Sequence, residues 1–153
     1  MRILVDSNLI LRLVQPAHQH HEAARTAVEN VRIRNDDLCI VPQVIYEFWV
    51  VATRPVAENS GLGMTGAQAQ HELGAIRKFF TFLDDEPGIF DEWYRLVIQY
   101  NVQGKPAHDA RFVAAMRRRG ITHILTFNAS DFRRYSEITV LSPDEVTQVS
   151  GQN

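Results

Sequence analysis

The chain of 153 residues contains a single cysteine, Cys39, which rules out an intramolecular disulfide. It also lacks a long hydrophobic run, since its most apolar segment, residues 38–52, is too short to span a bilayer and is interrupted by polar residues. Asp6 interrupts the N-terminal apolar stretch too early for the core of a signal peptide. These absences predict a protein with no membrane association that resides in the reducing cytoplasm.

An excess of positive charge is also missing. The formal net charge is −2, so the chain has no global basic field of the kind that most nucleic-acid-binding proteins use. This counts against binding of RNA or DNA by charge alone, but not against an enzyme that binds phosphate through metal ions. There is no internal repeat or low-complexity tract. We expect one domain over residues 1–142, followed by a polar C-terminal tail over residues 143–153.

Short apolar segments alternate with longer amphipathic ones along the chain. We expect strands at residues 2–5, 38–41, 80–84, 121–127 and 138–141, and helices at residues 8–15, 20–34, 42–53, 65–80, 88–100 and 107–119. Buried strands that alternate with helices indicate a parallel sheet covered on both faces. The sequence therefore predicts an α/β fold, a three-layer α/β/α sandwich around a central parallel sheet of four to five strands.

Two aspartates follow predicted strands. Asp6 comes directly after the first strand, and Asp131 lies in the loop NASDF after the strand at 121–127. In open parallel sheets, ligands bind beyond the carboxyl ends of the strands, so both positions suit a functional site. The alternatives are structural: Asp6 could cap the next helix together with Ser7, and Asn128 and Ser130 make the second loop a credible turn and helix cap.

Two further carboxylates lie within predicted helices. Asp109 shares a helix face with the apolar residues three, four and seven positions later, so it points inward, where an unpaired charge is costly. The alternative is that the helix dipole favours an acid in the first turn. Glu47 interrupts the apolar helix VIYEFWVVA. It could point inward, or it could form a narrow solvent-facing stripe with Gln43 and Arg54, and the spacing permits both.

Several carboxylates that converge without matching lysines repel one another, and hard divalent cations resolve this repulsion. We therefore predict a Mg²⁺ (or Mn²⁺) site, at which the metal would lower the pKa of a bound water and neutralise charge on a phosphate. Two rival enzyme classes fit poorly. A haloacid-dehalogenase phosphatase needs a second aspartate where this chain has Asn8, and a receiver domain needs a lysine at the end of ITHILTF.

The order of these motifs resembles a known family. LVDSN, a glutamate in a buried helix, HDA and LTFNASDF together resemble the PIN-domain ribonucleases, above all the VapC-type toxins of type II toxin–antitoxin pairs. The resemblance implies that the acidic metal-site residues are Asp6, Glu47, Asp109 and Asp131, with polar support from Ser7, Asn8, Thr126 and Asn128. Many relatives carry a second acidic residue where this chain has Asn128, which bears on a second metal ion.

The same resemblance implies a metal-dependent endoribonuclease that hydrolyses RNA phosphodiester bonds and leaves a 3′-hydroxyl and a 5′-phosphate. It also implies a cognate antitoxin protein and a homodimer. A PIN-like protein-interaction module with weak or no catalysis is the alternative. Arg111 is the preferred candidate for a phosphate contact because it lies two residues after Asp109, with Arg133 and Arg134 comparable. The histidines of HQHH at 18–21 and the arginines at 117–119 are expected to be solvated surface.

Overall fold

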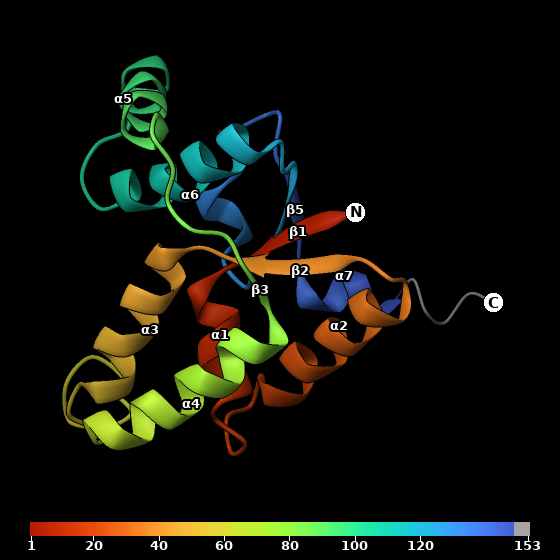
Figure 1. Cartoon of the computed structure of the whole chain (residues 1–153), viewed down its shortest axis with the longest axis vertical. Coiled ribbons are helices and arrows are strands. Elements are labelled where there is room, and N and C mark those ends of the chain that lie inside the picture. Colours follow the sequence, from red (N-terminus) through yellow and green to blue (C-terminus); the bar gives the residue numbers. More distant parts are fainter. Residues whose placement is uncertain (149–153) are drawn as a thin grey trace.

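The computed structural model describes residues 1–148, which form one five-stranded sheet between layers of helices (Figure 1). The strands are β1 (Arg2–Val5), β2 (Asp37–Ile40), β3 (Thr81–Phe82), β4 (His123–Leu125) and β5 (Thr139–Leu141). They lie in the order β3-β2-β1-β4-β5, and every neighbouring pair is parallel. This confirms the predicted fold class.

The helices lie on both faces of the sheet. They are α1 (Ser7–Leu13), α2 (His21–Ile33), α3 (Pro42–Thr53), α4 (Gly66–Phe79), α5 (Ile89–Gln99), α6 (Pro106–Arg119) and α7 (Pro143–Gln148), with a 3₁₀ turn, η1, at Ala129–Asp131. In Figure 1, α5 and α6 lie above the sheet and α1 to α4 below it. No helix among residues 1–148 is both long and apolar enough to cross a membrane.

The strand order places a crevice between β1 and β4. The chain runs outward from β1 through β2 to β3, then returns to the other side of β1 to form β4 and β5. In sheets of this kind, the crevice beyond the carboxyl ends of the strands at the reversal point is the usual ligand site. Asp6 follows β1, and the segment from Thr126 to Asp131 follows β4. The fold therefore brings both loops to one place.

Local signals explain most helix boundaries. Pro42 occupies the first turn of α3, and Thr65 forms a reciprocal capping box with Gln68 at the start of α4. Gly120 ends α6 with a φ of 65°, a conformation that a residue with a Cβ rarely adopts. The N-cap of α1 is Asp6, whose carboxylate accepts a hydrogen bond from the Ser7 backbone amide, so Asp6 does cap the helix as the structural alternative held.

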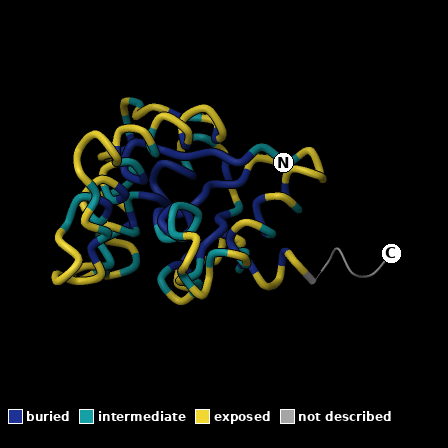
Figure 2. Tube along the Cα trace, turned by 90° about the horizontal axis from the view of Figure 1, so that it is seen from below, coloured by how far each residue is buried: buried dark blue, intermediate teal, exposed yellow. Residues whose placement is uncertain are grey.

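The core lies between the sheet and the two helical layers, where Figure 2 shows buried backbone enclosed by exposed loops and outer helix faces. Leu4, Ile40 and Ile124 from the central strands are fully buried, as are Phe48 of α3 and Phe112 of α6. Cys39 is also buried, and its thiol donates to the Ile3 carbonyl at 3.3 Å. Burial raises the pKa of that thiol to about 12, so it remains neutral.

The C-terminal segment contains more structure than the polar tail predicted for residues 143–153. Residues 143–148 form α7, which packs against α2 and buries Val146, while the Val146 carbonyl accepts from Arg34 at 3.1 Å. The helix begins with a capping box, because the Ser142 amide donates to Glu145 and the Glu145 amide donates back to the Ser142 hydroxyl. Residues 149–153 lie outside the described residues.

Candidate active site: a carboxylate-lined cleft

The four acidic side chains singled out in the sequence line one cleft of about 620 Å³. It lies at the crevice between β1 and β4, with α1, α3 and α6 around it. The predicted residues that line it are Asp6, Ser7, Asn8, Glu47, Asp109, Asn128 and Asp131. The structure thus brings together residues from four separate parts of the sequence. Their roles in catalysis or metal binding remain predictions.

Asp6 is held at the base of the cleft by four donors. Its Oδ1 accepts from the Ser7 amide at 2.7 Å and the Ser7 hydroxyl at 3.3 Å. Its Oδ2 accepts from the Thr126 hydroxyl at 2.7 Å and from the side-chain Nδ2 of Asn8 at 3.0 Å. Burial, with a contribution from the charge of Glu47, nevertheless raises its pKa to about 6. Asp6 is therefore both a helix cap and a member of the acidic cluster.

Glu47 points inward from α3. Its Oε2 accepts from the Ser7 hydroxyl at 2.5 Å, and its Oε1 accepts from the Gln43 side chain at 3.0 Å. Gln43 is only 7% exposed and also donates to the His108 carbonyl at 2.8 Å. The alternative of a solvent-facing stripe through Gln43, Glu47 and Arg54 is therefore wrong, because contacts with α1 and α6 orient this face of α3 toward the sheet edge.

Asp109 lies in the first turn of α6, opposite Asp131 of η1. Burial raises the pKa of Asp109 to about 7, and the charges of Asp131, Asp6 and Glu47 act in the same direction. Lys105, an exposed residue just before α6, acts in the opposite direction. The large upward shift shows that negative charge at this position is poorly compensated by the protein.

Thr126 connects the loop after β4 to the start of α1. This fully buried residue donates its hydroxyl hydrogen to Asp6, and its oxygen accepts from the Asn8 side chain at 3.1 Å and the Asn128 amide at 2.9 Å. The Phe127 amide donates to the Asn8 side chain at 3.3 Å. These contacts fix the position of the Asp6 carboxylate.

Several predicted cations do not lie in the cleft. Arg111 lines a neighbouring pocket and donates to Asp85 at 2.9 Å, while Arg133 and Arg134 are exposed in the segment after η1. Two cations that the sequence analysis did not select, Arg54 and Lys105, do line the cleft. Lys105 directly precedes the proline that begins the Asp109 helix, a signal that could have identified it.

The remaining basic clusters have structural roles. Arg117 pairs with Glu92 and Glu137, and Arg118 and Arg119 both pair with Glu86, so these side chains tie α6 to the α5 segment and the loop before β5. The arginines at 117–119, which the sequence analysis expects to be solvated surface, therefore belong to a network of ion pairs. In the HQHH segment, a ring nitrogen of His21 lies 2.9 Å from the Arg12 carbonyl. None of these residues lines the cleft described above.

The donor set of the cleft fits a hard divalent cation by its chemistry: carboxylate oxygens predominate, and two of the carboxyl groups have raised pKa values because of burial and mutual repulsion. The carboxylates do not form a preassembled cage of ligands. Within residues 1–148, no three side chains of His, Cys, Asp or Glu are already disposed to hold an ion. Any cation here would have to complete its shell with water or substrate oxygens.

Comparison with known proteins identifies the fold family. Among solved structures, the chain is similar to VapBC2 from Rickettsia felis bound to a promoter DNA fragment (TM-score 0.68, 14% identity, 93% of this chain and 98% of the other). It is also similar to VapBC-1 from nontypeable Haemophilus influenzae (0.66, 13%, 94% and 99%) and to VapC20 from Mycobacterium tuberculosis, described as a sarcin–ricin-loop-cleaving toxin (0.62, 15%, 87% and 95%).

Sequence comparison is consistent with this likeness. No curated protein matches the chain. The family model of the PIN domain matches residues 3–138, which is most of the chain and includes all four acidic positions. The match includes β1 from its second residue onward, all of β2, β3 and β4, and the whole cleft. The chain therefore belongs to the PIN-domain family, with the fold seen in VapC-type toxins.

Proposed function

We propose that this protein is a metal-dependent endoribonuclease that hydrolyses RNA phosphodiester bonds and acts as the toxin of a toxin–antitoxin pair. The observation that carries the proposal is the convergence of Asp6, Glu47, Asp109 and Asp131 on one cleft, where two of them have raised pKa values. An acidic cleft repels the phosphates of RNA unless a cation lies between them. A carboxylate cluster of this kind therefore makes chemical sense for a phosphodiesterase that works with Mg²⁺ or Mn²⁺.

The similar structures support the biological part of the proposal. VapC20 is described as a toxin that cleaves the sarcin–ricin loop, and the Rickettsia and Haemophilus structures are of VapBC pairs. By analogy, this chain would bind a cognate antitoxin protein, and the homodimer that the resemblance to the family implies belongs to the same proposal. The exposed apolar residues Tyr46 and Val50 on α3 line the cleft, and we assign one of these contacts to them. A cytoplasmic location belongs to the same proposal.

Each residue of the cleft has a definable task in this scheme. Asp6 and Asp109 would hold the principal cation, and Glu47 and Asp131 would complete the shell or orient the attacking water. A bound divalent cation would lower the pKa of water and offset the charge that develops on the phosphate. Ser7 and Thr126 orient Asp6 by hydrogen bonds, and Ser7 also orients Glu47. Lys105 and Arg54 are available to contact phosphates that flank the cleaved bond.

Cleavage of total RNA by the purified protein tests the proposal. The reaction is run with Mg²⁺, with Mn²⁺ and with EDTA, beside the variants Asp6→Asn and Asp109→Asn. Asp91→Asn is a matched control, because Asp91 is an acid in the first turn of a neighbouring helix and does not line the cleft. We expect cutting that needs metal and is lost in both cleft variants but not in the control. Cutting that survives both substitutions would show that the carboxylates are not the catalytic centre.

One observation favours the alternative of an interaction module with weak or no catalysis. Within the described residues, no three potential ligands stand ready to hold an ion, so the cleft is not a preformed metal centre. Protein that binds an antitoxin-like partner but neither retains a divalent cation nor cuts RNA under any of the conditions above would favour this alternative.

A further inference from the structure

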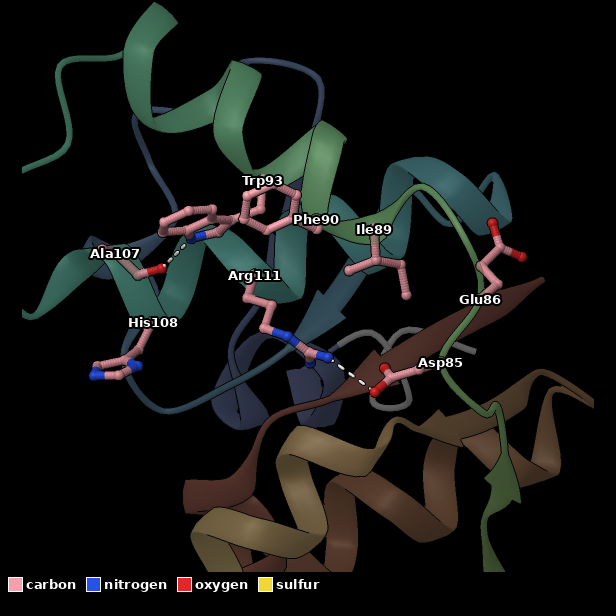
Figure 3. A pocket seen from close by; sticks show the side chains of 8 residues that line it. All are labelled: Asp85, Glu86, Ile89, Phe90, Trp93, Ala107, His108 and Arg111. Carbon is pink, nitrogen blue, oxygen red and sulfur yellow. Dashed lines mark hydrogen bonds and ion pairs between the residues drawn. The ribbon is translucent and has the colours of Figure 1, made fainter.

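Next to the acidic cleft lies a second pocket of about 480 Å³, formed between α5, the start of α6 and the loop after β3 (Figure 3). Its apolar wall consists of Ile89, Phe90 and Trp93, and its polar side carries Asp85, Glu86 and Arg111. Its volume is in the range of small-ligand sites. Neither the metal site nor the network that holds Asp6 uses these residues.

In the aromatic wall, a hydrogen bond holds Trp93 in place, and the ring of Phe90 is exposed to solvent. The Trp93 indole N–H donates to the Ala107 carbonyl at 2.8 Å, which fixes the ring and leaves only its face for a ligand. Phe90 is 69% exposed, with its ring centroid 5.9 Å from that of Trp93, and it stacks on Tyr94 at 6.3 Å. Large aromatic side chains held at the surface in this way are the usual platforms for unpaired nucleobases.

The polar side of the pocket can both donate and accept. The Arg111 guanidinium donates to Asp85 at 2.9 Å and to the Gln43 side chain at 3.5 Å, and it has five N–H groups in all. In Figure 3, Arg111 reaches below the aromatic residues toward Asp85. A carboxylate beside a guanidinium presents an acceptor and a donor, which match the edge of a base that carries both kinds of group.

The pocket adjoins the acidic cleft. His108 lines both cavities, and Gln43 bonds to Arg111 on one side and to Glu47 on the other. A strand of RNA whose phosphate occupied the cleft would therefore reach the pocket with a neighbouring nucleotide. A protein partner suits it less well, since aspartate and glutamate are depleted at protein–protein interfaces, and Asp85 and Glu86 both line this pocket.

We propose that this pocket binds an unpaired RNA base next to the cleaved phosphodiester, with the base stacked on Phe90 and Trp93 and its edge read by Asp85 and Arg111. The proposal rests on the proposed nuclease function for the identity of its ligand. It assigns to Arg111 a contact with a base edge rather than the phosphate contact expected from the sequence.

The test measures binding and cutting separately. Binding of a fluorescein-labelled single-stranded RNA of about 12 nucleotides and randomised sequence is followed by fluorescence anisotropy with Ca²⁺, a hard cation that offsets the charge of the acidic cleft. Gel electrophoresis of the RNA afterwards verifies that it is intact. The variant is Phe90→Ala. The matched control is Ile98→Ala, since Ile98 is 66% exposed on the same helix and does not line the pocket. Phe90→Trp tests rescue by another aromatic ring, and the same four proteins are assayed for RNA cleavage with Mn²⁺.

Loss of one base-stacking contact should weaken binding by about 5- to 140-fold in Phe90→Ala, with wild-type affinity in Ile98→Ala and recovery in Phe90→Trp. In the cleavage assay, the same variant should raise KM more than it lowers kcat. Equal affinity of Phe90→Ala and wild type, or no RNA binding by the wild type, would overturn the inference and leave this face to a protein partner. If RNA binding depends on Phe90 but the protein cuts no RNA, the base pocket is supported and the nuclease function is refuted. If the protein cuts RNA equally well with and without the Phe90 ring, the nuclease function is supported and the base pocket is refuted.

Discussion

Replacing Asp109 by asparagine is expected to stabilise the metal-free protein at alkaline pH, although it should abolish function. Burial and the charges of Asp131, Asp6 and Glu47 raise the pKa of Asp109 from 3.8 to about 7. A carboxyl group whose pKa is higher in the folded than in the unfolded state binds its proton more tightly when folded. Its ionisation therefore costs stability progressively as the pH rises from about 4 to about 7, and the full cost is present above that range.

The size of the effect follows from the shift. A rise in pKa from 3.8 to about 7 corresponds to about 4 kcal/mol at about 1.4 kcal/mol per pH unit. Asp109 is only half-buried, so solvent screening reduces this to about 1–2 kcal/mol. For a domain of this length, that change corresponds to an increase in Tm of about 2–8 °C. Near pH 5 only about a third of this cost has accumulated, so the substitution should raise the Tm correspondingly less there.

Differential scanning calorimetry in EDTA, at about pH 5 and about pH 8, measures this prediction, with wild type and variant compared at the same pH. The control is Asp91→Asn, which removes a first-turn carboxylate from α5 outside the cleft and should lower stability slightly at both pH values, because it loses a favourable interaction with the helix dipole. Equal Tm values for wild type and Asp109→Asn at the higher pH would refute the claim that burial and the neighbouring carboxylates raise the pKa of Asp109.

Three other perturbations test neighbouring parts of the site. Ser7→Ala removes the hydroxyl that bonds to both Glu47 and Asp6, and we expect RNA cleavage to fall by about 10- to 100-fold in a fluorogenic assay; unchanged activity would contradict a positioning role. Thr126→Val should lower the free energy of unfolding in urea by about 1–3 kcal/mol because buried groups lose their partner, whereas Thr126→Ser should keep most of it. Protons compete with metal at Asp6 and Asp109, whose pKa values are about 6 and about 7, so the Mg²⁺ concentration for half-maximal cleavage should rise as the pH falls below 7; a value independent of pH would contradict this.

The sequence contained enough information for the fold and for the meeting of Asp6, Asp109 and Asp131. The alternation of short apolar strands with helices determines a parallel sheet, and the positions of Asp6 and Asp131 after strands place them at the same edge. The stripe that Asp109 shares with Phe112 and Val113 predicted its direction correctly, because one face of α6 is clearly apolar and buried.

Other features depend on contacts that periodicity cannot reveal. α3 is apolar on most sides, so its sequence did not show whether Gln43 and Glu47 face solvent or the cleft; the His108 carbonyl and the Ser7 hydroxyl decide this in the folded protein. Arg111 pairs with Asp85, which is 26 residues away, and no local rule predicts this partner. By contrast, the capping box of Ser142 and Glu145 was a readable signal for α7.

The most direct test of the central claim is the binding of Mn²⁺ to the metal-free protein, measured by electron paramagnetic resonance of the free ion. The account predicts saturable binding by the wild type at about pH 8, lost in Asp109→Asn and retained in Asp91→Asn. Equal binding by the wild type and Asp109→Asn, or none by the wild type, would contradict the conclusion that these carboxylates form a cation site.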